Sequence, residues 1–325
     1  EQKTTLPDGV KVDQQNLKLV GLEGEHQDKE IIFEGIGDFD VVKKSIYRQG
    51  DKVMVVASYS DTGEVEYYIT DYVRSSALYW LFAVFFVVMI VIGGFKGFRA
   101  VVSLLISFFV IVYYIIPQIL SGADPIVVSI IGSLAILLAV IYLTEGFSRK
   151  SHIASLSILI SLVLTMFLSW FFVSLSKLSG IASEEIAFLV SLDTFSINFQ
   201  GLLLAGIIIG TLGVLDDVII SQISTVEELY KSAEYPNKKE IFKSSYKVGV
   251  SHISSMTNTL FLAYAGASLP LLILFVSGQS AFSGFSQVIN NESIATEIVR
   301  TLAGSIGLVL SVPLSTFLAV YFLKK

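Results

Sequence analysis

Residues 80–91 read WLFAVFFVVMIV, twelve positions without a charge or a proline. A strand of a membrane barrel would alternate apolar and polar residues, and this run does not alternate. No water reaches the hydrocarbon layer to satisfy backbone amides, so a continuous apolar segment that enters it has to be helical. The run therefore predicts a transmembrane helix.

Stretches of the same kind recur along the chain, and each is close to the roughly 20 mostly apolar residues that one crossing requires. Hydrophobic residues make up 53% of the chain and charged residues 15%, against about 25% charged in soluble proteins. The mean hydropathy is +0.72. The predicted spans cover residues 77–94, 101–120, 126–145, 153–176, 200–223, 250–276 and 301–323. We predict an all-α membrane bundle of about seven transmembrane helices over residues 77–325, so the lipid bilayer is the first expected partner.

One apolar run, Ile186–Leu192, is too short to cross a bilayer. It is bracketed by Glu184, Glu185 and Asp193. These acids favour a water-facing position, so we predict a surface or re-entrant helix.

Residues 1–76 predict a small β domain instead. The runs 30–34, 52–58 and 64–69 are rich in β-branched and aromatic residues, and Asp61–Gly63 between the last two favours a hairpin turn. We expect a small barrel or sandwich. His26 lies in an acidic stretch, but one His with scattered acids defines no metal geometry, so a solvated loop is expected there.

Charge and composition exclude several functions. The first 76 residues hold 9 Lys and Arg against 15 Asp and Glu, which accounts for the whole net charge of −6. An acidic outer domain argues against a nucleic-acid partner. The chain has no cysteine, which excludes disulfides and thiolate metal sites. We expect no cofactor, no metal and no enzymatic activity, because neither an HExxH motif nor a supported nucleophile is present.

Lysine and arginine predict the orientation. With residues 1–76 outside, the loops facing inward carry eleven of these residues, and those facing outward carry only Lys177 and Arg300, with Arg74 just ahead of the first span. This is a strong positive-inside bias. We predict a cell-membrane protein with its N-terminal domain outside and its C-terminus in the cytoplasm. Because residue 1 is Glu, an upstream helix or leader stays open.

The span over residues 200–223 carries two adjacent acids, Asp216 and Asp217. An Asp near the centre of a membrane helix costs about 2.5–3.5 kcal/mol on insertion scales, so such an acid predicts a function. At helical spacing Asp217 shares a face with the small residues Gly206, Gly210 and Gly213, whereas Asp216 shares a face with Ile and Leu. Small residues allow close helix packing. We therefore predict that Asp217 faces the bundle interior.

The next span offers a complementary polar face. It begins SHISSMTN, and we predict that four of its side chains hydrogen-bond the acid: Ser251, Ser254, Ser255 and Asn258. Such an acid suits a group that loads and releases a proton or cation. In the alternative interpretation, the aspartates lie near the cytoplasmic interface as a solvated helix end, which Glu227 and Glu228 soon after them favour. Glu145 with Arg149 and Lys150 predicts a juxtamembrane ion pair.

Several stretches together resemble the YibE/F family of bacterial membrane proteins. They are YYITDYVRS (67–75), GGFKGFRAVVSLLIS (93–107), YLTEGFSRKSHIASL (142–156), GTLGVLDDVIISQ (210–222) and SHISSMTNTLFLAYAGASLPLLILF (251–275). The resemblance runs from about Gly50 to the C-terminus and implies a multi-pass plasma-membrane protein. The Leu215–Val218 segment, followed by a Ser/Thr-rich helix, is distantly similar to SecD/SecF and other RND-superfamily membrane halves. That likeness implies proton-coupled export with Asp217 as the acid.

Two functions follow as alternatives. The first is an ion-coupled transporter or export accessory protein, whose partner is a small solute or ion of unknown identity. The second is a non-transporting membrane scaffold, whose outer β domain recruits an extracytoplasmic protein. A homo-oligomer, with a second copy of the chain as partner, stays open in both.

Overall fold

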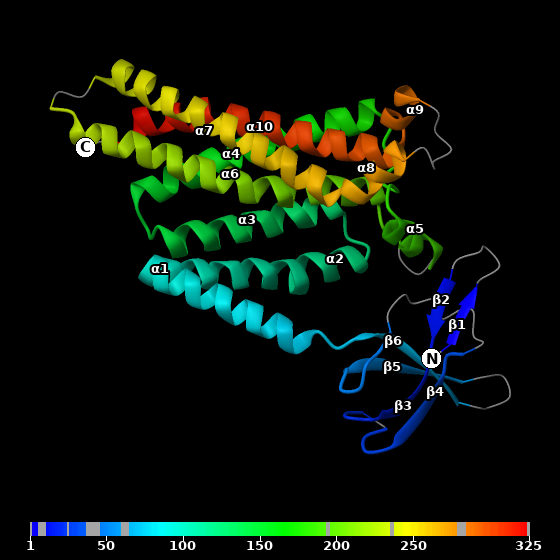
Figure 1. Cartoon of the computed structure of the whole chain (residues 1–325). Helices are drawn as coiled ribbons and strands as arrows, with labels where there is room; N and C mark the ends of the chain where they lie inside the picture. The colour runs from blue at the N-terminus through cyan, green and yellow to red at the C-terminus, as the bar shows by residue number, and fades with distance from the viewer. Residues whose placement is uncertain are drawn as a thin grey trace. The chain divides into compact units, whose positions relative to one another are not determined.

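The computed structural model describes residues 2–5, 11–24, 26–36, 46–59, 65–192, 196–234, 237–277 and 284–323 (Figure 1). The chain divides into two compact units, Glu1–Val88 and Met89–Lys325. The division falls inside the first long helix, so the predicted domain boundary at residues 76/77 stays a prediction.

The N-terminal unit contains three antiparallel pairs of strands. β1 (Gln2–Thr5) pairs with β2 (Lys11–Gln14), β3 (Asn16–Val20) with β4 (Glu30–Glu34), and β5 (Val53–Tyr59) with β6 (Val65–Tyr72). The three predicted strands are confirmed as β4, β5 and β6. The earlier three were missed: β1 and β2 carry almost no apolar residues, whereas β3, with the sequence NLKLV, has the alternation of a strand and could have been predicted.

This unit has a small apolar core. Ile31, Phe33 and Ile69 are its buried hydrophobic residues among those described. The predicted turn at Asp61–Gly63 lies outside the described residues. The described strands form two-stranded sheets, and β4 contacts β6; the expected barrel or sandwich stays a prediction.

The first membrane-type segment is one long helix with a break. α1 (Ser75–Val110), the π-helical turn Ile111–Ile115 and α2 (Ile116–Leu120) form 46 continuous residues. At 1.5 Å per residue they measure about 69 Å, roughly twice the 30 Å hydrocarbon core. Gly94 breaks the helix with φ 57° and ψ −136°, a conformation that glycine adopts readily. The break separates the two predicted spans 77–94 and 101–120.

The remaining long helices are α3 (Pro125–Thr144), α4 (Arg149–Leu175), α6 (Phe199–Ser232), α7 (Lys238–Ala267) and α10 (Glu292–Phe322). α7 continues into α8 (Leu269–Val276) through a 67° bend. Short helices α5 (Glu184–Ser191) and α9 (Phe285–Ile289) follow α4 and α8. α5 confirms the predicted short helix.

The described residues hold five helices that are long and apolar enough to cross a membrane, or six if the bent pair α7–α8 is one span. This fits a multi-pass membrane protein. The predicted count of seven additionally requires Ser75–Leu120 to cross twice, divided at Gly94.

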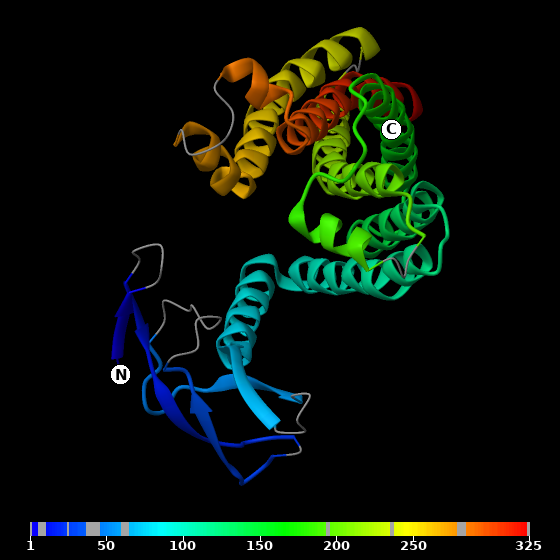
Figure 2. The ribbon, with the colours of Figure 1, turned by 90° about the vertical axis from the view of Figure 1, so that its right-hand side faces the viewer.

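Helices α4, α6 and α10 pack against one another at the centre of the bundle, with α3 beside α6 and α7 beside α10. Figure 2 shows the bundle turned by 90°; α6 packs against α4, α10, α3 and α7. The core between them is mostly Ile, Leu and Val.

Small residues at four-residue spacing allow α4 and α10 to approach closely. The buried positions on α4 are Ser157, Ser161, Thr165 and Ser169, and those on α10 are Ala303, Gly307, Ser311 and Ser315. Most of the hydroxyls donate to carbonyls of their own helix, so the interface itself is tight and largely apolar.

Candidate functional site

The packed face of α6 consists of large aliphatic residues. Leu215, Val218, Ile219 and Ile223 are fully buried against α4, α10 and α3. The opposite face, with Gly206, Gly210, Gly213 and Asp217, is exposed on this chain. Asp217 therefore does not face the core that α6 forms with α3, α4 and α10, and its predicted role stays a prediction. The close packing comes from serines and glycines of α4 and α10, which leaves room for the bulky side of α6.

Asp216, one helical step away, enters the packed region. Its residue is half-buried, and its Oδ1 atom is shielded from solvent with no hydrogen-bond partner among the described residues. It lies within electrostatic reach of Asp217 and of Glu145. The buried acid of this helix is Asp216.

Glu145 belongs to an ion pair at the turn between α3 and α4. It is the residue at the C-terminal end of α3, and its Oε2 accepts a hydrogen bond of 3.0 Å from Lys150 Nζ. Both side chains are about four-fifths buried. The predicted juxtamembrane ion pair is confirmed for Glu145 and Lys150, whereas the described structure gives Arg149, an exposed residue, no ion pair.

The position of the aspartates along α6 follows from the packing of its first turn. A Cβ on Gly201 would lie 3.4 Å from Pro125 Cδ, so Gly201 is level with the first residue of α3. Asp216 lies about 22 Å further along α6, and α3 is about 30 Å long. Asp216 is therefore level with a point about midway between the middle of α3 and its C-terminal end, which does not separate the interfacial alternative from a position deeper in the bilayer.

The predicted polar partners on α7 are not joined to the aspartates. Ser251, Ser254, Ser255 and Asn258 are all exposed, and no hydrogen bond links them to Asp216 or Asp217 within the described part of the chain. Ser254 instead donates to the carbonyl of Val250 at 3.2 Å. His252 is the α7 residue within electrostatic reach of Asp217.

A buried amide that the sequence analysis missed ties three helices together. Gln222 on α6 is 2% exposed, and its Nε2 donates to the Ser245 carbonyl on α7 (2.9 Å) and to Thr316 Oγ1 on α10 (2.7 Å). Gly249 allows this approach, because a Cβ there would lie 2.8 Å from Gln222 Oε1. An amide in an otherwise apolar run was the available signal.

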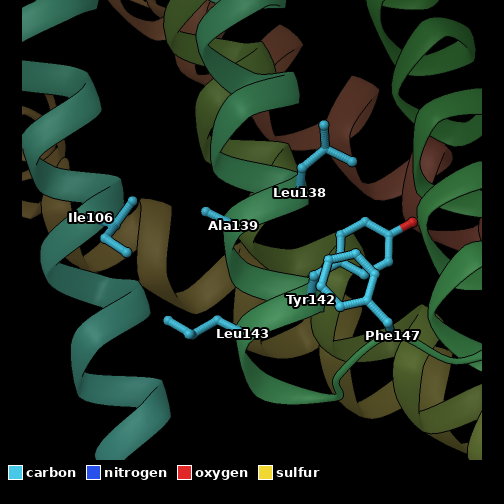
Figure 3. Close-up of a pocket in the computed structure, with 6 residues that line it drawn as sticks. All are labelled: Ile106, Leu138, Ala139, Tyr142, Leu143 and Phe147. Atoms are coloured by element: carbon cyan, nitrogen blue, oxygen red, sulfur yellow. The ribbon is translucent and has the colours of Figure 1, made fainter.

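An apolar pocket of about 260 Å³ lies beside the C-terminal end of α3 (Figure 3). It is lined by Ile106, Leu138, Ala139, Tyr142, Leu143 and Phe147. The Tyr142 ring stacks on Phe147 at 4.6 Å, and its hydroxyl bonds to His152 Nδ1 at 2.7 Å. The lining offers no carboxylate, imidazole or amine, and its one polar group is the Tyr142 hydroxyl, so this pocket adds no charge to the acid cluster.

The site is therefore a charge cluster of four residues from three helices: Asp216, Asp217, Glu145 and Lys150. It has three carboxylates and one ammonium group. Among the described residues no group of three His, Asp or Glu has the arrangement of a metal site.

Comparison with known proteins gives one family. The family model described as YibE/F-like protein matches residues 81–325, which include the whole charge cluster and leave out the β unit and the stretch 67–75. No curated protein and no solved structure matches the chain. The likeness to SecD/SecF stays a prediction from the sequence. Because the match covers far more than half of its length, the chain belongs to the YibE/F-like family.

Proposed function

We propose that this membrane protein is an ion-coupled transporter or export accessory protein in which Asp216 is the ion-carrying acid. The observation that carries the proposal is the buried Oδ1 of Asp216, which has no hydrogen-bond partner among the described residues. This replaces Asp217, the acid that the helix-face pattern favours.

A buried carboxyl oxygen without a partner costs about 1–3 kcal/mol, and more when the group is charged. Binding a proton removes the charge, and binding a cation supplies the missing partner. Either event lowers the free-energy cost of keeping Asp216 between packed helices. This cost therefore favours the binding of an ion. A polar residue with a purely structural role would have hydrogen-bond partners, as Gln222 has, and the Oδ1 atom of Asp216 has none among the described residues.

The neighbours of Asp216 couple its charge to the surrounding helices. Glu145 and Asp217 both repel its ionised form, and Lys150 is the nearby cation, already paired with Glu145. Loading an ion at Asp216 lowers the repulsion on Glu145 and so strengthens the pair that closes the α3–α4 turn. Asp217 lies on the open face toward α7, which supplies a polar exit for the ion.

Proteoliposomes test the proposal. We expect wild-type vesicles to take up protons, or ²²Na⁺, faster than empty vesicles under an imposed potential. Asp216→Asn keeps the shape but cannot change charge, so its uptake should fall to the rate of empty vesicles. Glu228→Gln, which changes an exposed carboxylate of the same helix outside the cluster, is the matched control and should retain most of the uptake. Wild-type vesicles that move neither ion would leave the scaffold function as the better account.

A second candidate function is supported by the β unit. Ile32, Met54 and Val56 on β4 and β5 are more than half exposed. Three large apolar side chains on short hairpins favour recruitment of a protein partner. If the chain is a scaffold, changing all three to Ser should abolish its cellular function while Asp216→Asn leaves it intact.

A further inference from the structure

A second pocket lies beside the N-terminal end of α6, whereas the aspartates of the charge cluster lie near the middle of that helix. It has a volume of about 610 Å³ and is lined by residues of α5, the first turns of α6, the α7–α8 bend and the first turns of α10. Gly206 forms part of its lining. This volume is within the range of about 300–1,000 Å³ that holds small organic ligands.

α10 supplies several of the polar residues of the lining. Arg300 Nη1 donates to Glu297 Oε1 at 2.9 Å, and both side chains are mostly buried. Arg300 Nε and the hydroxyl of Thr296 are shielded from solvent and have no hydrogen-bond partner among the described residues. Thr296 is 3% exposed. Two unsatisfied donors one helical turn apart suit an acceptor group such as a carboxylate.

The wall opposite α10 is held in place by hydrogen bonds. Glu292 Oε1 accepts from the backbone amides of Ser179 (2.7 Å) and Gly180 (3.0 Å), and Ser293 donates to the carbonyl of Ala182. Gly180 has a φ of 84° and lies against the Phe199 carbonyl, where any side chain would overlap. The pocket is thus preformed, which lowers the entropy cost of binding.

A broken helix supplies another wall. The 67° bend between α7 and α8 places Ser268 and Pro270 in the pocket lining. Pro270 has no backbone N–H, so the helical hydrogen bonding is interrupted there. Non-helical backbone at membrane depth is tolerated where it lines a cavity, and broken helices form the ligand sites of many transporters.

The charged residues that line this pocket indicate which class of ligand it binds. The pocket holds one cation, Arg300, and two acids, Glu297 and Glu185. The Ser183 hydroxyl hydrogen-bonds Glu185 and, with a backbone contact, holds the pKa of that exposed carboxyl below its usual value. A simple anion meets net repulsion, and a simple cation leaves the donors of Arg300 and Thr296 unmet. A zwitterion satisfies both signs.

We propose that this pocket binds a small zwitterion with an apolar body, an apolar amino acid or a dipeptide of such residues. Its carboxylate accepts from Arg300 and Thr296, its ammonium group lies toward Glu297 and Glu185, and its side chain packs on Leu202, Leu203 and Leu271. Binding here does not require ion coupling at Asp216, so the inference extends beyond the proposed function.

Equilibrium binding to the full chain in nanodiscs tests the inference, with leucine and leucyl-leucine as probes. We expect saturable binding of at least one of them. The probe with the lower dissociation constant shows whether the ligand is an amino acid or a dipeptide. N-acetyl-leucine and leucinamide, which each lack one charge, should bind at least tenfold more weakly. Equal binding of the acetylated probe, or no saturable binding of either zwitterion, would overturn the proposal.

Variants separate this pocket from the rest of the chain. Arg300→Gln should abolish binding, and Thr296→Val should weaken it about tenfold. Glu185→Gln, on the exposed rim, should weaken binding without affecting folding. Arg149→Gln at the other end of the bundle is the matched control and should bind as wild type. Asp216→Asn should also bind normally, so loss of ion movement and loss of ligand binding are distinguishable.

Discussion

Gly307 on α10 packs directly on the side chain of Thr165 on α4, and a Cβ at Gly307 would overlap with the Thr165 hydroxyl. Because Gly307 has no side chain, α10 lies directly against α4 at this position. The α4–α10 pair in turn forms the surface against which the aliphatic face of α6 packs.

Gly307→Ala should therefore separate α4 from α10 and lower stability by about 1–3 kcal/mol, the usual cost of overpacking. Gly304→Ala is the matched control, since its Cβ would lie 3.4 Å from Thr211 Oγ1, and it should be tolerated better. Thermal unfolding in detergent measures both. Replacing Thr165 with Gly in the Gly307→Ala background should recover stability; equal melting of the two single variants would refute the packing account.

Gln222→Leu should destabilise the bundle by about 1–3 kcal/mol, because it leaves the Ser245 carbonyl and the Thr316 hydroxyl without the amide donor. Ser221→Ala, one residue away on the less buried side, should change stability by less than about 0.5 kcal/mol. Unfolding in detergent with increasing denaturant compares them. Similar losses for both variants would show that Gln222 is not the tie between α6, α7 and α10.

Lys150→Gln should be more harmful than Glu145→Gln. It leaves Glu145 without its cation and within electrostatic reach of Asp216, whereas Glu145→Gln removes one repelling charge. The double variant should recover part of the stability lost in Lys150→Gln, with a coupling energy of about 1–3 kcal/mol for this largely buried pair. A double-mutant cycle measures it. Additive effects would mean that the pair contributes no coupling.

The predicted orientation can be tested directly because the chain has no native cysteine. Single cysteines at Ala123, Ser176 and Asn290 should react in intact cells with a membrane-impermeant maleimide. Cysteines at Phe147 and Lys239 should react only after the membrane is opened. Labelling of the second group in intact cells would reverse the topology.

The apolar spans could be predicted from the sequence because membrane insertion depends on hydropathy averaged over about 20 residues. The packing face of α6 could not, because which face is buried depends on the residue sizes of its neighbours. Ser161, Thr165 and Gly307 make α4 and α10 narrow, and the bulky face of α6 fits there. The sequence pattern of α6 alone placed Asp217 inside by analogy with glycine-mediated packing.

Arg300 shows a second limit of hydropathy. The predicted span began at residue 301, which assigned Arg300 to a loop as a topology signal. In the structure α10 begins at Glu292, and Arg300 pairs with Glu297 inside the helix. A helix can extend beyond its apolar window when its charges pair with each other, and periodicity alone does not reveal that pairing.

The central claim is that Asp216 is a buried acid that exchanges an ion. Infrared difference spectroscopy of the protein in lipid, recorded on a change of pH, tests it most directly, because a protonated carboxyl has its own C=O band. We predict that wild type shows a deuterium-sensitive carboxyl band, that Asp217→Asn retains it, and that folded Asp216→Asn loses it. An undiminished band in Asp216→Asn would contradict the account.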